Sequence, residues 1–149
     1  MSAERNKAIA RRFVEEGLNK GDLAALDEIL AANYVNHNAA PGMPPNREGF
    51  KGLVTMVRQA FPDAHVTIED IVAEGDRVVF RDTTRATHKG EFLGLPPTGK
   101  QATWAEMHIF RIADGKIVEH WHNEDMFSIL QQLGAIPTPA SAGGSSRSA

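Results

Sequence analysis

The chain has 149 residues, a net charge of -3, 42% hydrophobic and 23% charged residues, and no cysteine. This length favours one domain around a single core, and the composition is ordinary for a soluble globular protein. The lack of cysteine excludes disulfides, thiolate metal sites and cysteine nucleophiles. The sequence has no basic stripe typical of nucleic-acid binding, no apolar run of membrane-spanning length and no N-terminal signal core. We therefore expect a cytoplasmic protein that binds neither nucleic acid nor membrane.

The first sixty residues predict helices. Residues 4–18 place apolar side chains at helical spacing among charged ones, and Gly21 follows as a left-handed cap. Asp22 is expected to cap a second helix, and Asn46 a third. Between these two helices, residues 33–48 are rich in proline, glycine and asparagine, which predicts a long loop.

The rest of the chain alternates as strands do, with Asp114-Gly115 as a hairpin turn and residues 89–100 as a second loop. The expected elements are strands at 65–73, 77–88, 101–112 and 116–123, and a short helix at 126–133. Helices followed by antiparallel strands predict an α+β domain over residues 1–137, with three N-terminal helices on one face of a curved sheet. Residues 138–149 are of low complexity and are expected to be a disordered tail.

One face of the strand at 101–112 combines aromatic and titratable side chains. Because strand residues two apart share a face, Trp104, Glu106, His108 and Phe110 lie together. Two aromatic rings with one acid and one histidine are typical of the lining of a small-molecule site. In the alternative interpretation, Glu106 and His108 point to solvent or pair with each other.

Asp125 directly precedes the last predicted helix, close to Trp121 and Phe127. As a helix cap, its carboxylate would accept backbone N–H bonds, which lower the pKa and make it a poor base. As an acid–base catalyst, it would need an apolar environment that raises its pKa. The residues by themselves favour the cap.

Histidines at positions 120 and 122 would share one strand face and could begin a metal site. No third ligand has a telling spacing, so we expect no metal site. We expect instead that one of His120 and His122 faces water and the other hydrogen-bonds locally.

His37 opens the long loop, where it could lie over a pocket mouth or on the open surface. Arg81 and Asp82 lie on the long strand, and either of them would need a partner if buried, because an isolated buried charge is costly.

Motifs spread over residues 5–136 resemble the SnoaL-like polyketide cyclases, a branch of the NTF2-like superfamily. The resemblance rests on Tyr34-Val-Asn-His37, Phe61-Pro-Asp63, Thr87-His88-x-Gly-Glu-Phe-x-Gly-x-Pro-Pro-Thr-Gly99, His108-Ile-Phe-Arg111, Asp114-Gly-Lys-Ile-Val-Glu-His-Trp121, Asp125 and Leu130-Gln-Gln-Leu-Gly134.

The resemblance implies a cone of the NTF2-like (cystatin-like) type, in which a mostly antiparallel sheet and helices enclose an apolar pocket. It implies ring closure of a polyketide ester by intramolecular aldol condensation, with neither metal nor cofactor, in a homodimer or homotetramer. Asp125 matches the acid–base aspartate of the family, and His108 matches a histidine that binds or polarises the substrate carbonyl. The pocket walls would be Phe50, Trp104 and Trp121, and the rim residues Tyr34 and His37.

Three further residues complete the expected substrate-binding set. Glu106 belongs to it through the mixed strand face, and His122 through its position beside Asp125, where the resemblance gives it no role. Arg81 belongs to it through an alternative activity: in an epoxide hydrolase, Arg81 and Asp82 would hold the attacking water. An isomerase that uses the same pocket is part of this alternative. A second alternative is a non-catalytic protein that binds small hydrophobic ligands on the same scaffold.

Overall fold

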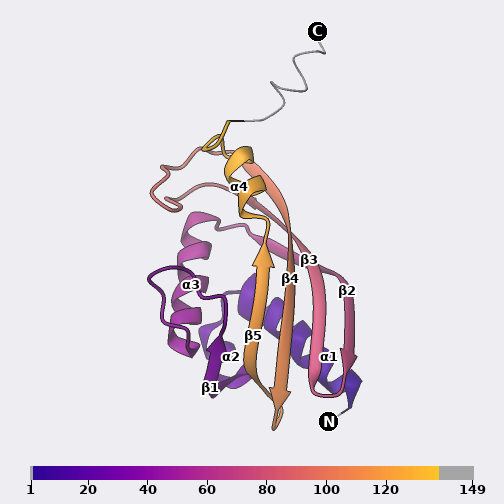
Figure 1. Cartoon of the computed structure of the whole chain (residues 1–149). Coiled ribbons are helices and arrows are strands. Elements are labelled where there is room, and N and C mark those ends of the chain that lie inside the picture. The colour runs from indigo at the N-terminus through magenta and orange to yellow at the C-terminus, as the bar shows by residue number, and fades with distance from the viewer. Residues whose placement is uncertain (1, 138–149) are drawn as a thin grey trace.

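The computed structural model describes residues 2–137 of the chain, and the expected tail at 138–149 lies outside them. The described part contains a five-stranded sheet with α1, α2 and α3 on one face (Figure 1). This arrangement confirms the expected α+β class with N-terminal helices against a curved sheet. The elements in chain order are α1 (Ala3–Arg12), the π-helix η1 (Phe13–Asn19), α2 (Leu23–Ile29), β1 (Leu30–Asn36), α3 (Arg47–Ala60), β2 (His65–Glu74), β3 (Arg77–Thr87), β4 (Gln101–Ala113), β5 (Lys116–Glu124) and α4 (Met126–Gln132).

The sheet has the strand order β1-β5-β4-β3-β2. Strands β2 to β5 pair antiparallel as three consecutive hairpin-like pairs, and the edge strand β1 runs parallel to β5. Asp114 and Gly115 join β4 to β5 with φ values of 51° and 75°, the left-handed backbone that a two-residue hairpin turn requires.

Strand β1 lies where the sequence predicted the end of a helix and the start of a loop. Its pairing with β5 is short, with a register break between Leu30 and Val35. The strand therefore depends on a partner about 85 residues away in the chain, and a local sequence pattern cannot predict such a pairing. The prediction of a loop over 33–48 is wrong for residues 33–36.

The predicted helix caps are confirmed. The side chain of Asp22 accepts a hydrogen bond from the backbone N–H of Ala25 at 3.0 Å, and Asn46 accepts one from Gly49 at 2.9 Å. The first helix differs from the prediction because it widens into η1 near its end. There, a Cβ on Gly17 would lie 2.6 Å from the Leu26 side chain, so the glycine allows η1 to pack closely on α2.

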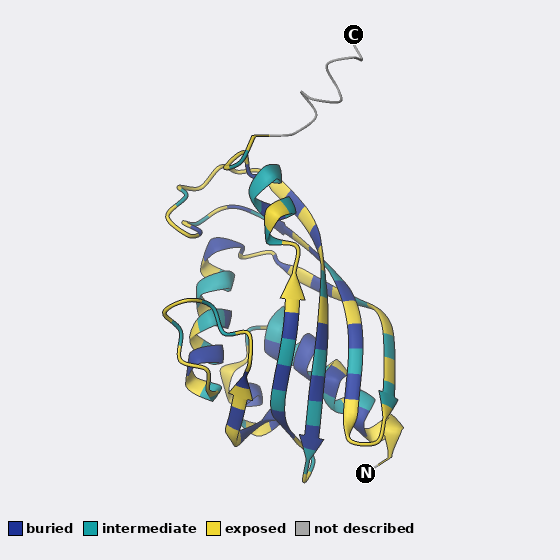
Figure 2. Cartoon of the chain, in the orientation of Figure 1, coloured by how far each residue is buried: buried dark blue, intermediate teal, exposed yellow. Residues whose placement is uncertain are grey.

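Buried and exposed residues alternate along β3, β4 and β5, so that one face of each strand points to the helices (Figure 2). The buried side chains form two clusters. The first lies between the sheet and α1, η1, α2 and α3, and includes Phe13 and Phe110. The second joins the end of α3 to the 88–100 loop and α4, and includes Phe61 and Trp104. No helix in residues 2–137 is long and apolar enough to cross a membrane.

Candidate active site

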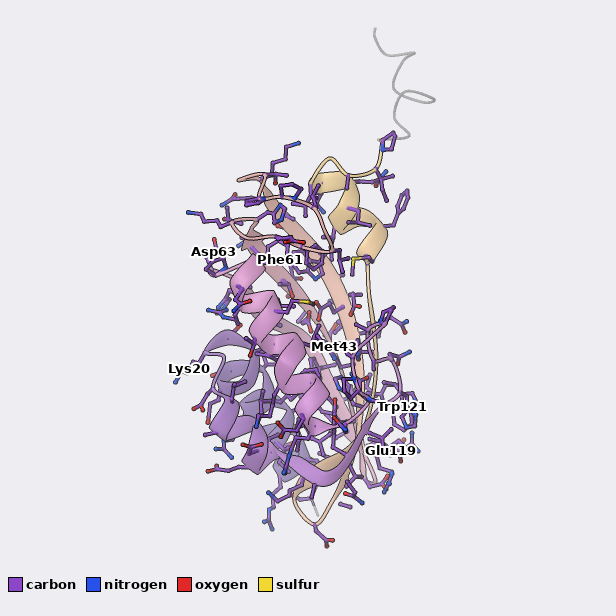
Figure 3. All side chains as sticks on the ribbon, turned by 90° about the vertical axis from the view of Figure 1, so that its left-hand side faces the viewer. Lys20, Met43, Phe61, Asp63, Glu119 and Trp121 are labelled. Carbon is purple, nitrogen blue, oxygen red and sulfur yellow. The ribbon has the colours of Figure 1, made fainter. Side chains whose placement is uncertain are left out.

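A cavity of about 180 Å³ lies where the two hydrophobic clusters meet. Helix α3, the inner face of the sheet, the 88–100 loop and α4 all contribute to its wall. Figure 3 shows Phe61, one of the lining residues, at the C-terminal end of α3. The wall is mostly apolar, and its larger members are Phe50, Leu53, Val57, Phe61, Phe92, Leu93, Trp104, Met126 and Ile129. Such a surface is typical of a site for a small hydrophobic molecule.

The sheet supplies the titratable side chains of this cavity. Strand register aligns Asp82, Glu106 and Glu124 across β3, β4 and β5, and it aligns His108 with His122 in the next row. Because inward positions recur every second residue, both rows face the helices. Of these five residues, all except Asp82 line the cavity. The predicted grouping of Trp104, Glu106, His108 and Phe110 on one inward face is confirmed.

His108 lies beside two carboxyl groups. Its Nε2 is 3.0 Å from Oε1 of Glu106 and 3.3 Å from Oδ2 of Asp82. Burial by itself would lower the pKa of His108, but the contacts with Asp82 and Glu106 raise that pKa to about 9. His108 is therefore an imidazolium at neutral pH and a source of a proton inside an apolar cavity.

Burial and hydrogen bonding shift the pKa values of the two carboxyl groups in opposite directions. Burial favours the neutral form of Glu106, but the hydrogen bond from His108 outweighs it and lowers the pKa of Glu106. Trp104 also donates its Nε1–H to Oε2 of Glu106 at 2.7 Å. Burial raises the pKa of Asp82, which is 1% exposed and whose two oxygens have no hydrogen-bond partner among the described residues. Two titratable groups whose pKa values are pushed apart can divide the roles of acid and base.

His122 forms a separate pair with Glu124. Its Nδ1 lies 3.1 Å from Oε1 of Glu124, while its Nε2 is buried without a partner among the described residues. A carboxylate at one ring nitrogen fixes the tautomer and leaves the other nitrogen as an acceptor. His122 thus offers the cavity a base whose proton-accepting atom is not already occupied.

His120, the third histidine, lies behind His108, away from the carboxyl groups. Its Nε2 is 2.9 Å from Nδ1 of His108, and its Nδ1 is 2.7 Å from the hydroxyl of Tyr34. The expectation that one of His120 and His122 faces water is wrong, since both are buried. The register of β5 against β4 turns both of them inward.

Asp125 lies outside the cavity. Strand β5 ends at Glu124, and Asp125 is exposed at the start of α4, where its carboxylate accepts the backbone N–H of Ser128 at 3.1 Å. It is absent from the cavity wall. The geometry therefore gives Asp125 the role of a helix cap, the interpretation that the residues themselves favoured.

Four other expected binding residues also lie away from the cavity. Tyr34 is buried behind His120, in contact with its ring. His37 stacks on Trp121 with ring centroids 4.7 Å apart, and it pairs with Glu119 on the outer side of β5. In Figure 3, Trp121 and Glu119 lie at the margin of the molecule. Arg81 is exposed and pairs with Asp70 rather than with its neighbour Asp82, because adjacent strand residues face opposite sides.

The expected residues that do line the cavity are Phe50, Trp104, Glu106, His108 and His122. Sequence reasoning missed Glu124 and gave Asp82 only a conditional role. The sequence pattern did indicate Asp82, because Val78, Phe80 and Asp82 are spaced two residues apart and therefore share the inward face of β3.

The ligand atoms of Asp82, Glu106 and His108 lie within 4.8 Å of one another, so this set could also hold a cation. A shared proton accounts for the same short distances.

A sequence profile of the SnoaL-like polyketide cyclases matches residues 8–133 of the chain. The chain belongs to the SnoaL-like polyketide cyclase family. The curated aklanonic acid methyl ester cyclase DnrD of Streptomyces peucetius is 32% identical over 135 residues, which cover 88% of this chain and 92% of that protein. The nogalonic acid methyl ester cyclase of Streptomyces nogalater is 30% identical over 119 residues, covering 78% and 88%.

Solved structures give the same relationship for this SnoaL-like cyclase. TsrD of Streptomyces laurentii superimposes with a TM-score of 0.83 at 29% identity, covering 91% of this chain and 99% of that one. IdmH of Streptomyces antibioticus has a TM-score of 0.77 at 37% identity, covering 87% and 98%. The family inferred from the sequence motifs, its NTF2-like fold and the assignment to the polyketide cyclases are confirmed.

Proposed function

We propose that this SnoaL-like cyclase closes a ring in an aromatic polyketide ester by an intramolecular aldol reaction, with His122 as the base and the His108–Glu106 pair as the acid. One observation carries the proposal: the unpartnered Nε2 of His122 and the imidazolium of His108 lie on the same inward sheet face, beside one apolar cavity. The rings of His108 and His122 are stacked with centroids 5.6 Å apart. An aldol reaction needs such a base for its carbon acid and such an acid for its new alkoxide.

The substrate class follows from the cavity wall and from the relatives. Two relatives are named for their action on the methyl esters of aklanonic and nogalonic acid. Phe50, Phe61 and Trp104 offer aromatic surface to a flat ring system. An ester also lacks the negative charge of a free acid, which Glu106 and Glu124 at the cavity would repel.

In the first step, a C–H bond next to a carbonyl breaks and its proton passes to Nε2 of His122. The electron pair stays on the substrate as an enolate. Glu124 stabilises the imidazolium that forms, because it accepts the Nδ1–H of His122. The apolar wall holds the enolate carbon close to the carbonyl carbon that it attacks, which removes most of the entropic cost of ring closure.

In the second step, the new C–C bond converts that carbonyl into an alkoxide, which must gain a proton. Glu106 lines the cavity and shares the Nε2 proton of His108. Glu106 therefore passes this proton to the alkoxide, and His108 becomes neutral. The proton gained by His122 balances the one lost by His108, and its return to His108 restores the resting enzyme.

The experiment compares wild type with His122→Gln, Glu106→Gln and Asp125→Asn, using aklanonic acid methyl ester as the probe. Ring closure is followed by chromatography, and loss of the acidic C–H in D2O is followed by NMR. We expect His122→Gln to slow both processes by at least about 100-fold, the usual contribution of a general base. Asp125→Asn should retain activity within about twofold, because asparagine caps helices as well as aspartate does.

Three outcomes would contradict this assignment. Full activity of His122→Gln together with an inactive Asp125→Asn would return the acid–base role to Asp125. Binding without exchange or ring closure in wild type would favour a ligand-binding protein. Loss of wild-type activity in a chelator, restored by a divalent cation, would favour a metal at Asp82, Glu106 and His108. An epoxide hydrolase built on Arg81 and Asp82 has no geometric support, because these side chains point to opposite faces of β3.

A further inference from the structure

Three buried side chains, Tyr34, His120 and His108, form a continuous hydrogen-bonded line, and the proposed reaction uses only His108 of the three. The hydroxyl of Tyr34 contacts Nδ1 of His120 at 2.7 Å, and Nε2 of His120 contacts Nδ1 of His108 at 2.9 Å. Tyr34 is 1% exposed, His120 0% and His108 5%. The line begins on β1, crosses β5 and ends on β4 at His108, whose other ring nitrogen contacts the carboxyl groups.

His120 lies among aromatic rings. Its ring centroid is 5.6 Å from that of Phe13, 5.6 Å from that of Phe50 and 4.8 Å from that of Phe110. Burial lowers the pKa of His120 well below 6.5, and the positive charge of His108 lowers it further. His120 is therefore neutral. A neutral imidazole has one ring proton, so it donates through one nitrogen and accepts through the other.

Two directions of donation are consistent with these distances. In the inward direction, Tyr34 donates to Nδ1 of His120, and Nε2–H of His120 donates to Nδ1 of His108. In the outward direction, Nδ1–H of His108 donates to Nε2 of His120, and Nδ1–H of His120 donates to the oxygen of Tyr34. The inward direction leaves no place for a proton on Nδ1 of His108. An imidazolium at His108 requires the outward direction.

We propose that Tyr34 and His120 are positioning residues that hold a proton on Nδ1 of His108 through outward donation. His108 then exchanges its other proton at Nε2, the nitrogen that faces Glu106. This inference rests on the proposed function, in which His108 and Glu106 supply the acid. The groups that face His108 are Asp82 and Glu106 at Nε2, His120 at Nδ1 and the stacked ring of His122.

The hydroxyl of Tyr34 is the group on which the direction depends. Burial raises the pKa of Tyr34, so it stays a neutral hydroxyl that can accept the Nδ1–H of His120. Tyr34→Phe removes this acceptor within an aromatic environment, where an unpaired N–H is costly. We expect His120 to change to its Nε2–H tautomer in this variant and to donate to His108. That donation opposes the cation, so the pKa of His108 should fall.

The experiment is a pH series of ring-nitrogen NMR spectra on protein with 15N-labelled histidine. In wild type at pH 7, we expect His120 to be the Nδ1–H tautomer and His108 to carry both ring protons. In Tyr34→Phe, we expect the Nε2–H tautomer at His120 and a titration midpoint for His108 that is lower by at least one pH unit. Trp121→Phe changes an aromatic side chain outside the cavity and should leave both signals as in wild type.

An Nε2–H tautomer of His120 in wild type would overturn the proposal, and this measurement needs no variant to fold. An unchanged midpoint of His108 in folded Tyr34→Phe would also overturn it. In turnover, the basic limb of the kcat profile of Tyr34→Phe should move to lower pH while KM stays near the wild-type value. Because the NMR spectra need no substrate, failure of the positioning role of Tyr34 and His120 is distinguished from failure of the cyclase assignment.

Discussion

The charge state of one nitrogen, Nε2 of His108, links the chemistry of the cavity to the stability of the protein. Its contacts with Glu106 and Asp82 raise the pKa of His108 from 6.5 to about 9. A group with a raised pKa in the folded state stabilises that state fully below its unfolded pKa. The contribution is then lost as the pH rises through the folded pKa.

We therefore expect the free energy of unfolding to fall between pH 6.5 and pH 9, by up to about 3 kcal/mol at about 1.4 kcal/mol per pKa unit. Urea unfolding at several pH values, followed by circular dichroism, measures this change. Glu106→Gln is the matched control, since it keeps the shape but removes a charge that holds the His108 proton. The free energy of unfolding of Glu106→Gln should fall clearly less over the same pH range. An equal fall would mean that another group causes the pH dependence.

At the scale of elements, the start of α4 decides the role of Asp125. The helix spans seven residues, Met126–Gln132, and the Asp125 side chain satisfies the backbone N–H of Ser128. Ile129 and Leu133 from this segment are buried in the second cluster, close to the cavity. The cap therefore stabilises one wall of the cavity, although Asp125 itself does not line it.

Asp125→Ala should cost about 1 kcal/mol of stability, the usual loss when a helix cap is replaced by alanine. Asp125→Asn should recover most of that loss. Thermal unfolding of the two variants measures the difference, and ring closure measured well below the midpoint should remain near wild type in both. A loss of activity in Asp125→Asn at unchanged stability would contradict the capping role.

Local patterns in the sequence predicted most of these elements but not β1. Period-two alternation identified β2 to β5, and the caps at Asp22 and Asn46 identified the helix starts. Strand β1 was missed because its hydrogen-bond partner, β5, lies far along the chain. The shared face of Glu106 and His108 could be predicted from period-two alternation as well, because both residues belong to the one strand β4.

At the scale of the whole molecule, the cavity depends on register between strands. Glu106, Asp82 and Glu124 come together only because β3, β4 and β5 pair as they do. No spacing within a strand gives that alignment, so the residues alone favoured a cap for Asp125 and did not reveal the pairing of His122 with Glu124. The family motifs supplied the fold correctly. The catalytic role that they imply for Asp125 stays a prediction, because a family position does not report whether a side chain caps a helix or faces a cavity.

The outer face of the sheet gives the last prediction. Register aligns Val72, Val79, Ile109 and Trp121 into an apolar row across β2, β3, β4 and β5, on the face away from α1, α2 and α3. Val72 is 61% exposed, and Met107 beside the row is 53% exposed. Contiguous apolar surface of this kind is typical of protein–protein contact. Together with the assembly that the family resemblance implies, it predicts a dimer or tetramer formed through this face.

We expect Ile109→Glu to convert the assembly into monomers, because a buried, unpaired carboxylate at its centre would oppose association. Light scattering coupled to size-exclusion chromatography measures the mass of each species. Asp114→Asn, in the β4–β5 turn, changes the net charge by one unit in the opposite direction outside the row and should leave the assembly intact. The monomer should keep the wild-type circular dichroism spectrum, since His108 and the cavity lie on the opposite face of the sheet. A monomeric wild type, or an Ile109→Glu variant with the wild-type mass, would place the contact surface elsewhere.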